Sequence, residues 1–222
     1  MEKRISSIIL AALICLSSLC AQEFTDGKIR LYLWALRDSY PEYTEEKPYQ
    51  QAKDHLVSLS EFILNGMTYG WDFVYTPSDK LRGVKEYFEC IPRHTFDDDR
   101  KNIEFDSVYL RDDKIFCWVN FNRTPQMEIY YKQMSNIKNP HVLGSGKGKV
   151  SKGFPGVEEA ALLAIKDGIR EYYRKIIKNK PKEISGTILI RKIPAIYIDS
   201  GHYVVELDFF LQTSKIKEYS QF

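Results

Sequence analysis

The apolar and polar positions of this chain alternate with two different periods, which predict strands and helices in turn. Residues 28–36 are branched or aromatic in partial alternation, which predicts a strand. From Pro48 onwards apolar residues recur every three or four positions and predict an amphipathic helix that ends near Asn65 and Gly66. Aromatic residues at every second position of 69–75 then predict a strand with one aromatic face.

The rest of the first half gives shorter elements. Residues 80–90 place apolar positions on one face of a short predicted helix. Residues 104–121 predict a hairpin that turns at Asp112 and Asp113, and a Thr-Pro pair opens a predicted helix over residues 124–134. The main order in this half is therefore strand, helix, strand and hairpin.

The second half of the chain repeats this order more clearly. Residues 141–150 predict a short strand that runs into glycines, and residues 157–178 predict a helix with acidic residues in its first turn and basic residues in its last. Residues 185–193 and 196–211 predict strands, with a hairpin turn at Ser200-Gly201. Small residues form a stripe that would let the helix approach a sheet closely: Ala160, Ala161, Ala164 and Gly168.

An internal duplication would explain the repeated order. Residues 108–121 align with residues 196–209 without a gap, so that Tyr109 meets Tyr197. Coincidence is the alternative, because any two amphipathic hairpins share part of this pattern.

The predicted fold class is α+β, with helices packed on antiparallel sheets in two strand–helix–strand–hairpin modules. We place the modules at residues 22–135 and 136–222. The chain has 222 residues, of which 44% are hydrophobic and 28% charged, and these values are typical of folded domains that can each bury a core.

Residues 1–21 have the composition of a secretory signal peptide. A positively charged start precedes an apolar run over residues 5–19, which is too short to span a bilayer comfortably and is followed by small residues. Cleavage after Ala21 would release the mature protein into the periplasm or the cell envelope. The alternative is a bacterial lipoprotein, in which a lipid on Cys20 would associate the protein with a membrane.

The charge of the chain argues against one class of partner. The formal net charge is only +2, so composition gives no reason to expect a surface that binds nucleic acid.

The sequence contains no motif for catalysis, for a cofactor or for a metal. The four histidines lie in no metal-ligand or catalytic spacing. Residues 144–149 lack the spacing of a phosphate-binding loop, so we expect a flexible turn there, and the acidic run 97–99 lacks the pattern of a calcium loop. We therefore expect no catalytic residue, cofactor or metal; a hydrolase without a recognisable motif is an alternative.

Two stretches are candidate binding surfaces. The basic side chains of the glycine-rich stretch, Lys147 and Lys149, could contact a partner. The aromatic strand face could stack on a glycan or a peptide, unless a helix covers it, as is more common. That face comprises Tyr69, Trp71, Phe73 and Tyr75.

Cys90 and Cys117 are the cysteines that remain beyond the leader. An oxidising compartment would permit one disulfide between them, and two buried free thiols are the alternative.

One stretch resembles a known group of proteins. Val142-Leu-Gly-Ser-Gly-Lys-Gly-Lys149, followed by the alanine-rich helix from Val157, resembles the small α+β modules of envelope lipoproteins and flagellum-associated proteins of the FlgP and FlgT kind. The resemblance covers residues 141–211 and only faintly residues 28–121. Together with the leader, the chain is also similar to uncharacterised exported spirochaete proteins.

The resemblance implies a function without catalysis, because this group has no catalytic residues to carry over. It implies an exported cell-envelope protein with a structural or adaptor role, whose partners are other envelope proteins, flagellum-associated ones among them. A periplasmic module that binds a glycan or a peptide on the aromatic strand face is the alternative.

Overall fold

The computed structural model describes residues 27–37 and 49–219. The predicted leader at residues 1–21 and the candidate lipidation site Cys20 lie outside the described residues.

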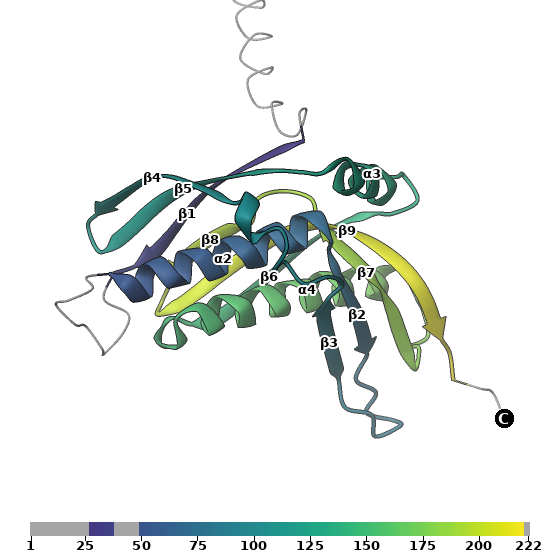
Figure 1. Cartoon of the computed structure of the whole chain (residues 1–222). Coiled ribbons are helices and arrows are strands. Elements are labelled where there is room, and N and C mark those ends of the chain that lie inside the picture. The colour runs from purple at the N-terminus through teal and green to yellow at the C-terminus, as the bar shows by residue number, and fades with distance from the viewer. Residues whose placement is uncertain (1–26, 38–48, 220–222) are drawn as a thin grey trace, which may run out of the picture.

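The described elements confirm an α+β fold in which helices pack on antiparallel sheets (Figure 1). The first strand, both hairpins with their turns and the two long helices are confirmed, with ends shifted by a few residues. In chain order the α-helices and strands are β1 (Lys28–Leu36), α2 (Gln50–Thr68), β2 (Trp71–Thr76), β3 (Tyr87–Pro92), β4 (Glu104–Arg111), β5 (Lys114–Asn122), α3 (Pro125–Met134), β6 (His141–Lys149), α4 (Phe154–Ile176), β7 (Glu183–Ile190), β8 (Ala195–Asp199) and β9 (His202–Lys217).

The strands form two antiparallel sheets. One has the order β1-β5-β4, and the other has the order β3-β2-β7-β9-β6, with β8 also paired to β9. Figure 1 shows the three-stranded sheet at the top, α2 beneath it and the β2–β3 hairpin pointing downwards. β2 lies in the first half of the chain but pairs with β7 in the second half, and one hydrophobic core joins both sheets. The two modules predicted at residues 22–135 and 136–222 therefore share a sheet and a core.

Helix α4 lies directly on strand β6 because each presents small residues to the other. A Cβ atom added to Gly144 would lie 2.0 Å from the carbonyl oxygen of Ala164. A Cβ atom on Gly146 would lie 2.1 Å from the carbonyl oxygen of Ala160. Both distances are much shorter than a van der Waals contact, so a side chain at either position would clash with the helix. The backbones of α4 and β6 can approach this closely only because both residues are glycine. The small-residue stripe that the sequence predicted on this helix is thus used for close packing.

The prediction of a flexible turn at residues 144–149 is wrong, because this stretch is part of β6. The strand pairs with β9 over its whole length, from His141 opposite Phe210 to Lys149 opposite His202. Glycine at every second position indicates flexibility when the stretch is considered alone, but in a strand this spacing puts all the glycines on one face.

The short helix predicted over residues 80–90 is also absent from the structure. Asp79 closes a turn instead, since its Oδ1 accepts hydrogen bonds from the backbone N–H of Leu81 at 3.0 Å and of Arg82 at 3.3 Å. The residues that follow pair with β2 as strand β3. A local turn and a neighbouring strand therefore outweigh the helical spacing of the apolar residues.

Helix α2 does not end at Gly66 as predicted but continues to Thr68. A Cβ atom on Gly66 would lie 2.6 Å from Cδ1 of Ile190. The absence of a side chain at Gly66 therefore lets Ile190 pack against α2. The left-handed glycine comes later, at Gly70, with φ of +73°.

The two hairpins have equivalent registers. Tyr109 pairs with Phe116 in the first hairpin, and the aligned Tyr197 pairs with Val204 in the second. Each hairpin is also extended by a third strand in an equivalent position. β1 pairs with the second strand of the first hairpin, β5, and β6 pairs with the corresponding part of β9 in the second hairpin. A duplication would produce these registers; the duplication itself stays a prediction.

We predict that Gly146→Ala lowers the free energy of unfolding by about 1–3 kcal/mol, because the new methyl group forces α4 away from β6. Urea unfolding of the purified protein measures this change. Ser145→Ala is the matched control, because Ser145 is the exposed neighbour on the same strand and should change stability by less than about 0.5 kcal/mol. Equal stability of the Gly146 variant and the control would contradict the close packing.

The core also holds a histidine, which connects stability to pH. His55 of α2 is 4% exposed, and its ring contacts those of Phe154 and Tyr203 at centroid distances of 5.6 Å and 6.3 Å. Burial lowers the pKa of His55 to about 4 from its ordinary value of 6.5. The imidazole is therefore neutral in the folded protein at pH values where it is already protonated in the unfolded chain.

We predict that the stability contributed by neutral His55 is complete above pH 6.5 and is lost as the pH falls towards 4. The unfolded chain binds the extra proton in this window, so the free energy of unfolding falls by up to about 3 kcal/mol. Between pH 6.5 and 4, the free energy of unfolding should depend less steeply on pH for His55→Leu than for the wild type. An unchanged slope in His55→Leu would refute the prediction.

Candidate functional site

The aromatic strand face predicted as a binding platform is buried. Trp71, Phe73 and Tyr75 are each 2–3% exposed, and the ring of Phe62 from α2 lies 4.7 Å from that of Trp71. The face is thus covered, as the alternative interpretation of the sequence held. Tyr69 is not on the strand, because it follows the last residue of α2.

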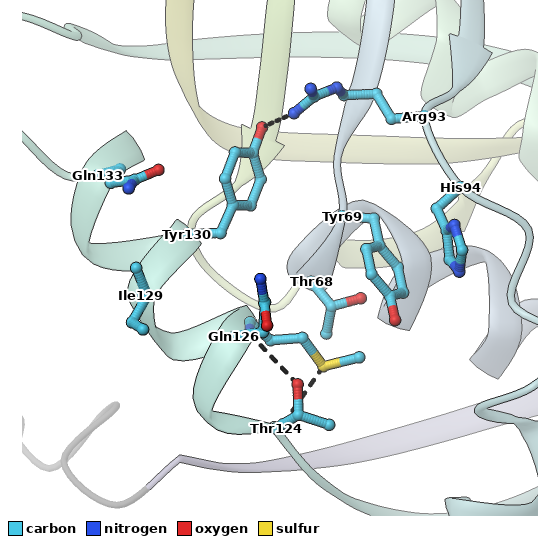
Figure 2. Close-up of a pocket in the computed structure, with 10 residues that line it drawn as sticks. Thr68, Tyr69, Arg93, His94, Thr124, Gln126, Ile129, Tyr130 and Gln133 are labelled. Atoms are coloured by element: carbon cyan, nitrogen blue, oxygen red, sulfur yellow. Dashed lines mark hydrogen bonds between the residues drawn. The ribbon is translucent and has the colours of Figure 1, made fainter.

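Tyr69 instead lines a cavity of about 400 Å³ between the end of α2, the segment after β3 and helix α3 (Figure 2). Figure 2 shows the rings of Tyr69 and His94 side by side across from α3, and their centroids are 4.4 Å apart. The Tyr69 hydroxyl donates a hydrogen bond to Asp99 Oδ2 at 2.5 Å, and burial together with this carboxylate raises the pKa of Tyr69. The ring is thereby fixed in one orientation at the cavity wall.

Arg93 supplies the positive charge of this cavity. Its Nη1 donates a hydrogen bond to the Tyr130 hydroxyl at 2.5 Å, and its guanidinium lies 5.2 Å from the centre of the Tyr130 ring. Asp72 lies 3.3 Å from Arg93 Nε on the other side. A guanidinium held in this way, next to aromatic rings and the amides of Gln126 and Gln133, is suited to bind a polar ligand that carries an acceptor group.

A second aromatic surface lies on the outer face of the three-stranded sheet, and the sequence did not single it out. Tyr109, Phe116 and Tyr32 stack across the three strands, with ring centroids 5.5 Å and 5.4 Å apart. Trp118 continues the row at 4.7 Å from Tyr32, and the guanidinium of Arg30 lies 4.3 Å above the Trp118 ring. We call these five residues the aromatic row.

The sequence carries the signal for the aromatic row, since its aromatic residues recur at every second position of β1 and β5. The same signal occurs in β2, where the rings are buried. The packing of the helices decides which of these faces meets solvent, since α2 covers Trp71 and α4 lies beside Tyr75.

Strand β4 forms an edge of the same sheet and is exposed along its whole length. Its backbone pairs with β5 on one side only. Four of its side chains are large, apolar and 41–53% exposed: Phe105, Val108, Tyr109 and Leu110. Charged residues and bulges oppose pairing at edge strands; β4 has charged residues at 104, 106 and 111, but its apolar residues 108–110 are consecutive and exposed.

Of the two lysines of the glycine-rich stretch, Lys147 is already in an ion pair. Lys147 Nζ lies 2.8 Å from Asp199 Oδ2 at the tip of the second hairpin, and this carboxylate raises the pKa of Lys147. Lys149 is exposed at the end of β6.

The disulfide considered for Cys90 and Cys117 does not form. Both thiols are free, and they belong to different sheets, Cys90 to β3 and Cys117 to β5. Burial raises the pKa of Cys90 to about 12, so its thiol is protonated at neutral pH and is a poor nucleophile.

Residues 27–37 and 49–219 contain no group of three or more His, Cys, Asp or Glu side chains that could hold a metal ion. Two residues of the acidic run interact with protein side chains. Asp97 lies 3.5 Å from Arg100, and Asp99 accepts the hydrogen bond from Tyr69. Within the same residues, no helix is both long enough and apolar enough to cross a bilayer.

Comparison with known proteins places the chain in a family. The chain is 30% identical over 195 residues to a protein of Treponema pallidum (strain Nichols) that is described as an uncharacterized protein, and the match covers 86% of this chain and 82% of that protein. No solved structure matches. A protein-family model matches residues 17–219, almost the whole chain. The chain therefore belongs to the family that this model defines.

Proposed function

We propose that this protein is an exported adaptor of the bacterial cell envelope that binds another envelope protein along the free edge of strand β4. The observation that carries the proposal is the exposed row of apolar side chains on an edge strand whose backbone is paired on one side only. Export rests on the predicted leader, and the resemblance to flagellum-associated envelope proteins suggests where the partner is found.

The geometry favours addition of a strand from the partner. An edge strand offers backbone N–H and C=O groups at regular spacing, and a partner strand can pair with them while its side chains contact those of β4. Leu110 and Phe105 face the same side as the buried residues Ile115 and Val119 of β5, so a partner would extend the inner face of the sheet. Tyr109 faces the other side, where the partner would meet the aromatic row.

A bulge in β4 limits the register of such a pairing. The pairing with β5 shifts between Asp106 and Tyr109, and Ser107 has a left-handed φ of +53°. A partner strand would therefore pair with one half of β4, and residues 108–111 carry most of the apolar side chains.

We predict that a photo-crosslinking amino acid at Val108 captures a defined partner from native envelopes, and that Leu110→Lys abolishes the capture. A lysine on an edge strand opposes strand addition, whereas the fold should lose less than about 0.5 kcal/mol because Leu110 is already 47% exposed. Mass spectrometry of the crosslinked product identifies the partner.

Ile137 provides the control, because it is 99% exposed on the connection between α3 and β6, far along the chain from β4. The same crosslinker at Ile137 should not capture this partner, and Ile137→Lys should leave capture at Val108 unchanged. Capture that is equal at both positions would exclude the edge strand as the binding surface.

The cavity beside Tyr69 favours a second candidate function, a periplasmic ligand-binding module. Its volume of about 400 Å³ lies within the range of small-molecule sites, and Arg93 is already oriented by Tyr130 and Asp72. The sequence placed a glycan or peptide on the aromatic strand face, which is buried. In the present proposal the ligand instead binds in the cavity, where Tyr69 is the one residue of that face that still contributes.

We predict that a ligand of this cavity is a glycan or peptide with an acceptor group, and that it raises the melting temperature of the wild type in a thermal-shift panel. Arg93→Ala should abolish the shift. Tyr197→Ala, a change at an exposed tyrosine on β8, should preserve it. A shift that persists in Arg93→Ala would assign the ligand to a different site.

A further inference from the structure

The end of the molecule formed by the β2–β3 connection and the residues after α4 carries two adjoining depressions. One, of about 280 Å³, lies between β2 and the last turns of α4. The other, of about 620 Å³, lies beside the β2–β3 connection, and the two share Ser78, Lys178 and Lys180. Figure 1 shows the β2–β3 connection at the lower end of the molecule, away from the three-stranded sheet.

Cationic side chains dominate the lining of these depressions. The lining contains six of them against three carboxylates, Asp79, Glu86 and Glu218. We call these six residues the basic end: Lys80, Arg82, Arg170, Arg174, Lys178 and Lys180.

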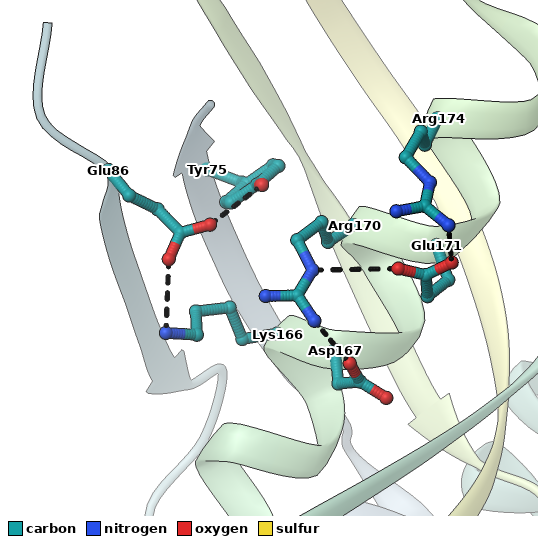
Figure 3. Close-up of polar contacts among 7 residues, drawn as sticks. All are labelled: Tyr75, Glu86, Lys166, Asp167, Arg170, Glu171 and Arg174. Carbon is teal, nitrogen blue, oxygen red and sulfur yellow. Dashed lines mark hydrogen bonds and ion pairs between the residues drawn. The ribbon is translucent and has the colours of Figure 1, made fainter. Parts of the chain in front are cut away.

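Two of the three carboxylates are already engaged. Glu86 lies between the Tyr75 hydroxyl at 3.0 Å and Lys166 Nζ at 3.2 Å, as Figure 3 shows. Asp79 Oδ2 lies 2.6 Å from Arg82. Neither is therefore available to neutralise the lysines of the basic end.

The two shared lysines have the greatest capacity to bind an anion. Arg170 and Arg174 form ion pairs along α4, with Asp167 at 2.6 Å and Glu171 at 2.9 Å respectively. Lys178 and Lys180 form no ion pair with a carboxylate among the described residues. Lys180 Nζ donates a hydrogen bond to the carbonyl oxygen of Ser78 at 2.7 Å, which fixes its ammonium group at the boundary of both depressions and leaves two further protons to donate.

An exposed apolar side chain lies among these charges. Leu81 is 97% exposed and stands between Lys80 and Arg82 on the β2–β3 connection. The wall of the smaller depression is also apolar in part, with Ile177 beside the buried Ile184. An exposed leucine side chain has an unfavourable free energy of hydration in water. At a membrane surface it can enter the boundary between headgroups and acyl chains, while flanking lysines and arginines contact phosphates.

We propose that the basic end binds the surface of an anionic phospholipid membrane. Leu81 enters the interface, Lys178 and Lys180 contact headgroup phosphates, and Lys80 and Arg82 lie beside the inserted leucine. The charge surplus of this end and the single exposed leucine together favour a lipid surface over an acidic protein, because a protein partner would be expected to cover a wider apolar area.

This contact is independent of the partner site at β4, since it uses other residues at another part of the fold. An adaptor that binds a protein along one sheet edge and lipid at the basic end would hold its partner close to a membrane.

The test is co-sedimentation of the purified protein with vesicles of two compositions. We predict binding to phosphatidylcholine vesicles that contain about 30 mol% phosphatidylglycerol, weak binding to phosphatidylcholine alone, and loss of the difference at about 0.5 M NaCl. The double variant Lys178→Gln/Lys180→Gln should bind the anionic vesicles on the order of tenfold more weakly, and Leu81→Ser several-fold more weakly.

Matched controls separate this contact from general effects. Lys138→Gln removes a positive charge and Leu143→Ser an exposed leucine elsewhere on the surface, and both should bind as the wild type does. All variants keep the same N-terminus, so a leader or lipid anchor would act equally on each of them and on both vesicle compositions.

Three results would overturn the proposal. Equal binding to neutral and anionic vesicles would attribute binding to the N-terminus, and equal binding of the double variant and its controls would exclude the basic end. A rise in melting temperature with inorganic phosphate, together with loss of vesicle binding in its presence, would assign the basic end to a free phosphate compound. Vesicle binding that survives in Leu110→Lys would show that the lipid contact does not depend on the proposed partner site.

Discussion

The direct contact between the backbones of α4 and β6 is the constraint on which the rest of this structure depends. Gly144 and Gly146 leave no side chain between strand and helix. On the helix side, the buried Ala160 and Ala164 lie directly against them. A helix held this closely fixes the position of β9, which pairs with β6 and carries β7 and β8. Because β2 pairs with β7, the same contact also places the first half of the chain.

This arrangement separates the surfaces that can bind partners. Helix α2 lies under the three-stranded sheet, so the inner faces of β1 and β5 are covered, while β4 extends beyond the covered region and stays exposed. The C-terminal end of α4 and the β2–β3 connection meet at another end of the molecule, where the cations gather. A modest net charge for the chain therefore conceals an uneven distribution of that charge.

The sequence predicted the strands and helices well where hydrophobic period and turn chemistry agreed. Lys28–Leu36 and the hairpin turns at Asp112 and Ser200 are such cases. It failed at residues 80–90, where Asp79 and a neighbouring strand outweigh a helical period, and at residues 144–149, where glycine served packing rather than flexibility. The first failure came from a local turn that the apolar period does not reveal, whereas the second depends on β9 and α4, which follow later in the chain.

The sequence by itself determined the α+β class, the two long helices, the two hairpins and the small-residue stripe of α4, because these follow from spacing along the chain. The tertiary structure alone decided which aromatic face is exposed. Alternating aromatic residues occur in β2 and in β5, but Trp71 of β2 is buried beneath Phe62 of α2, whereas Phe116 and Trp118 of β5 are only half-buried on the outer face of their sheet. The candidate sites at β4, at Arg93 and at the basic end likewise consist of residues far apart in sequence, which only the packing of the sheets and helices brings together.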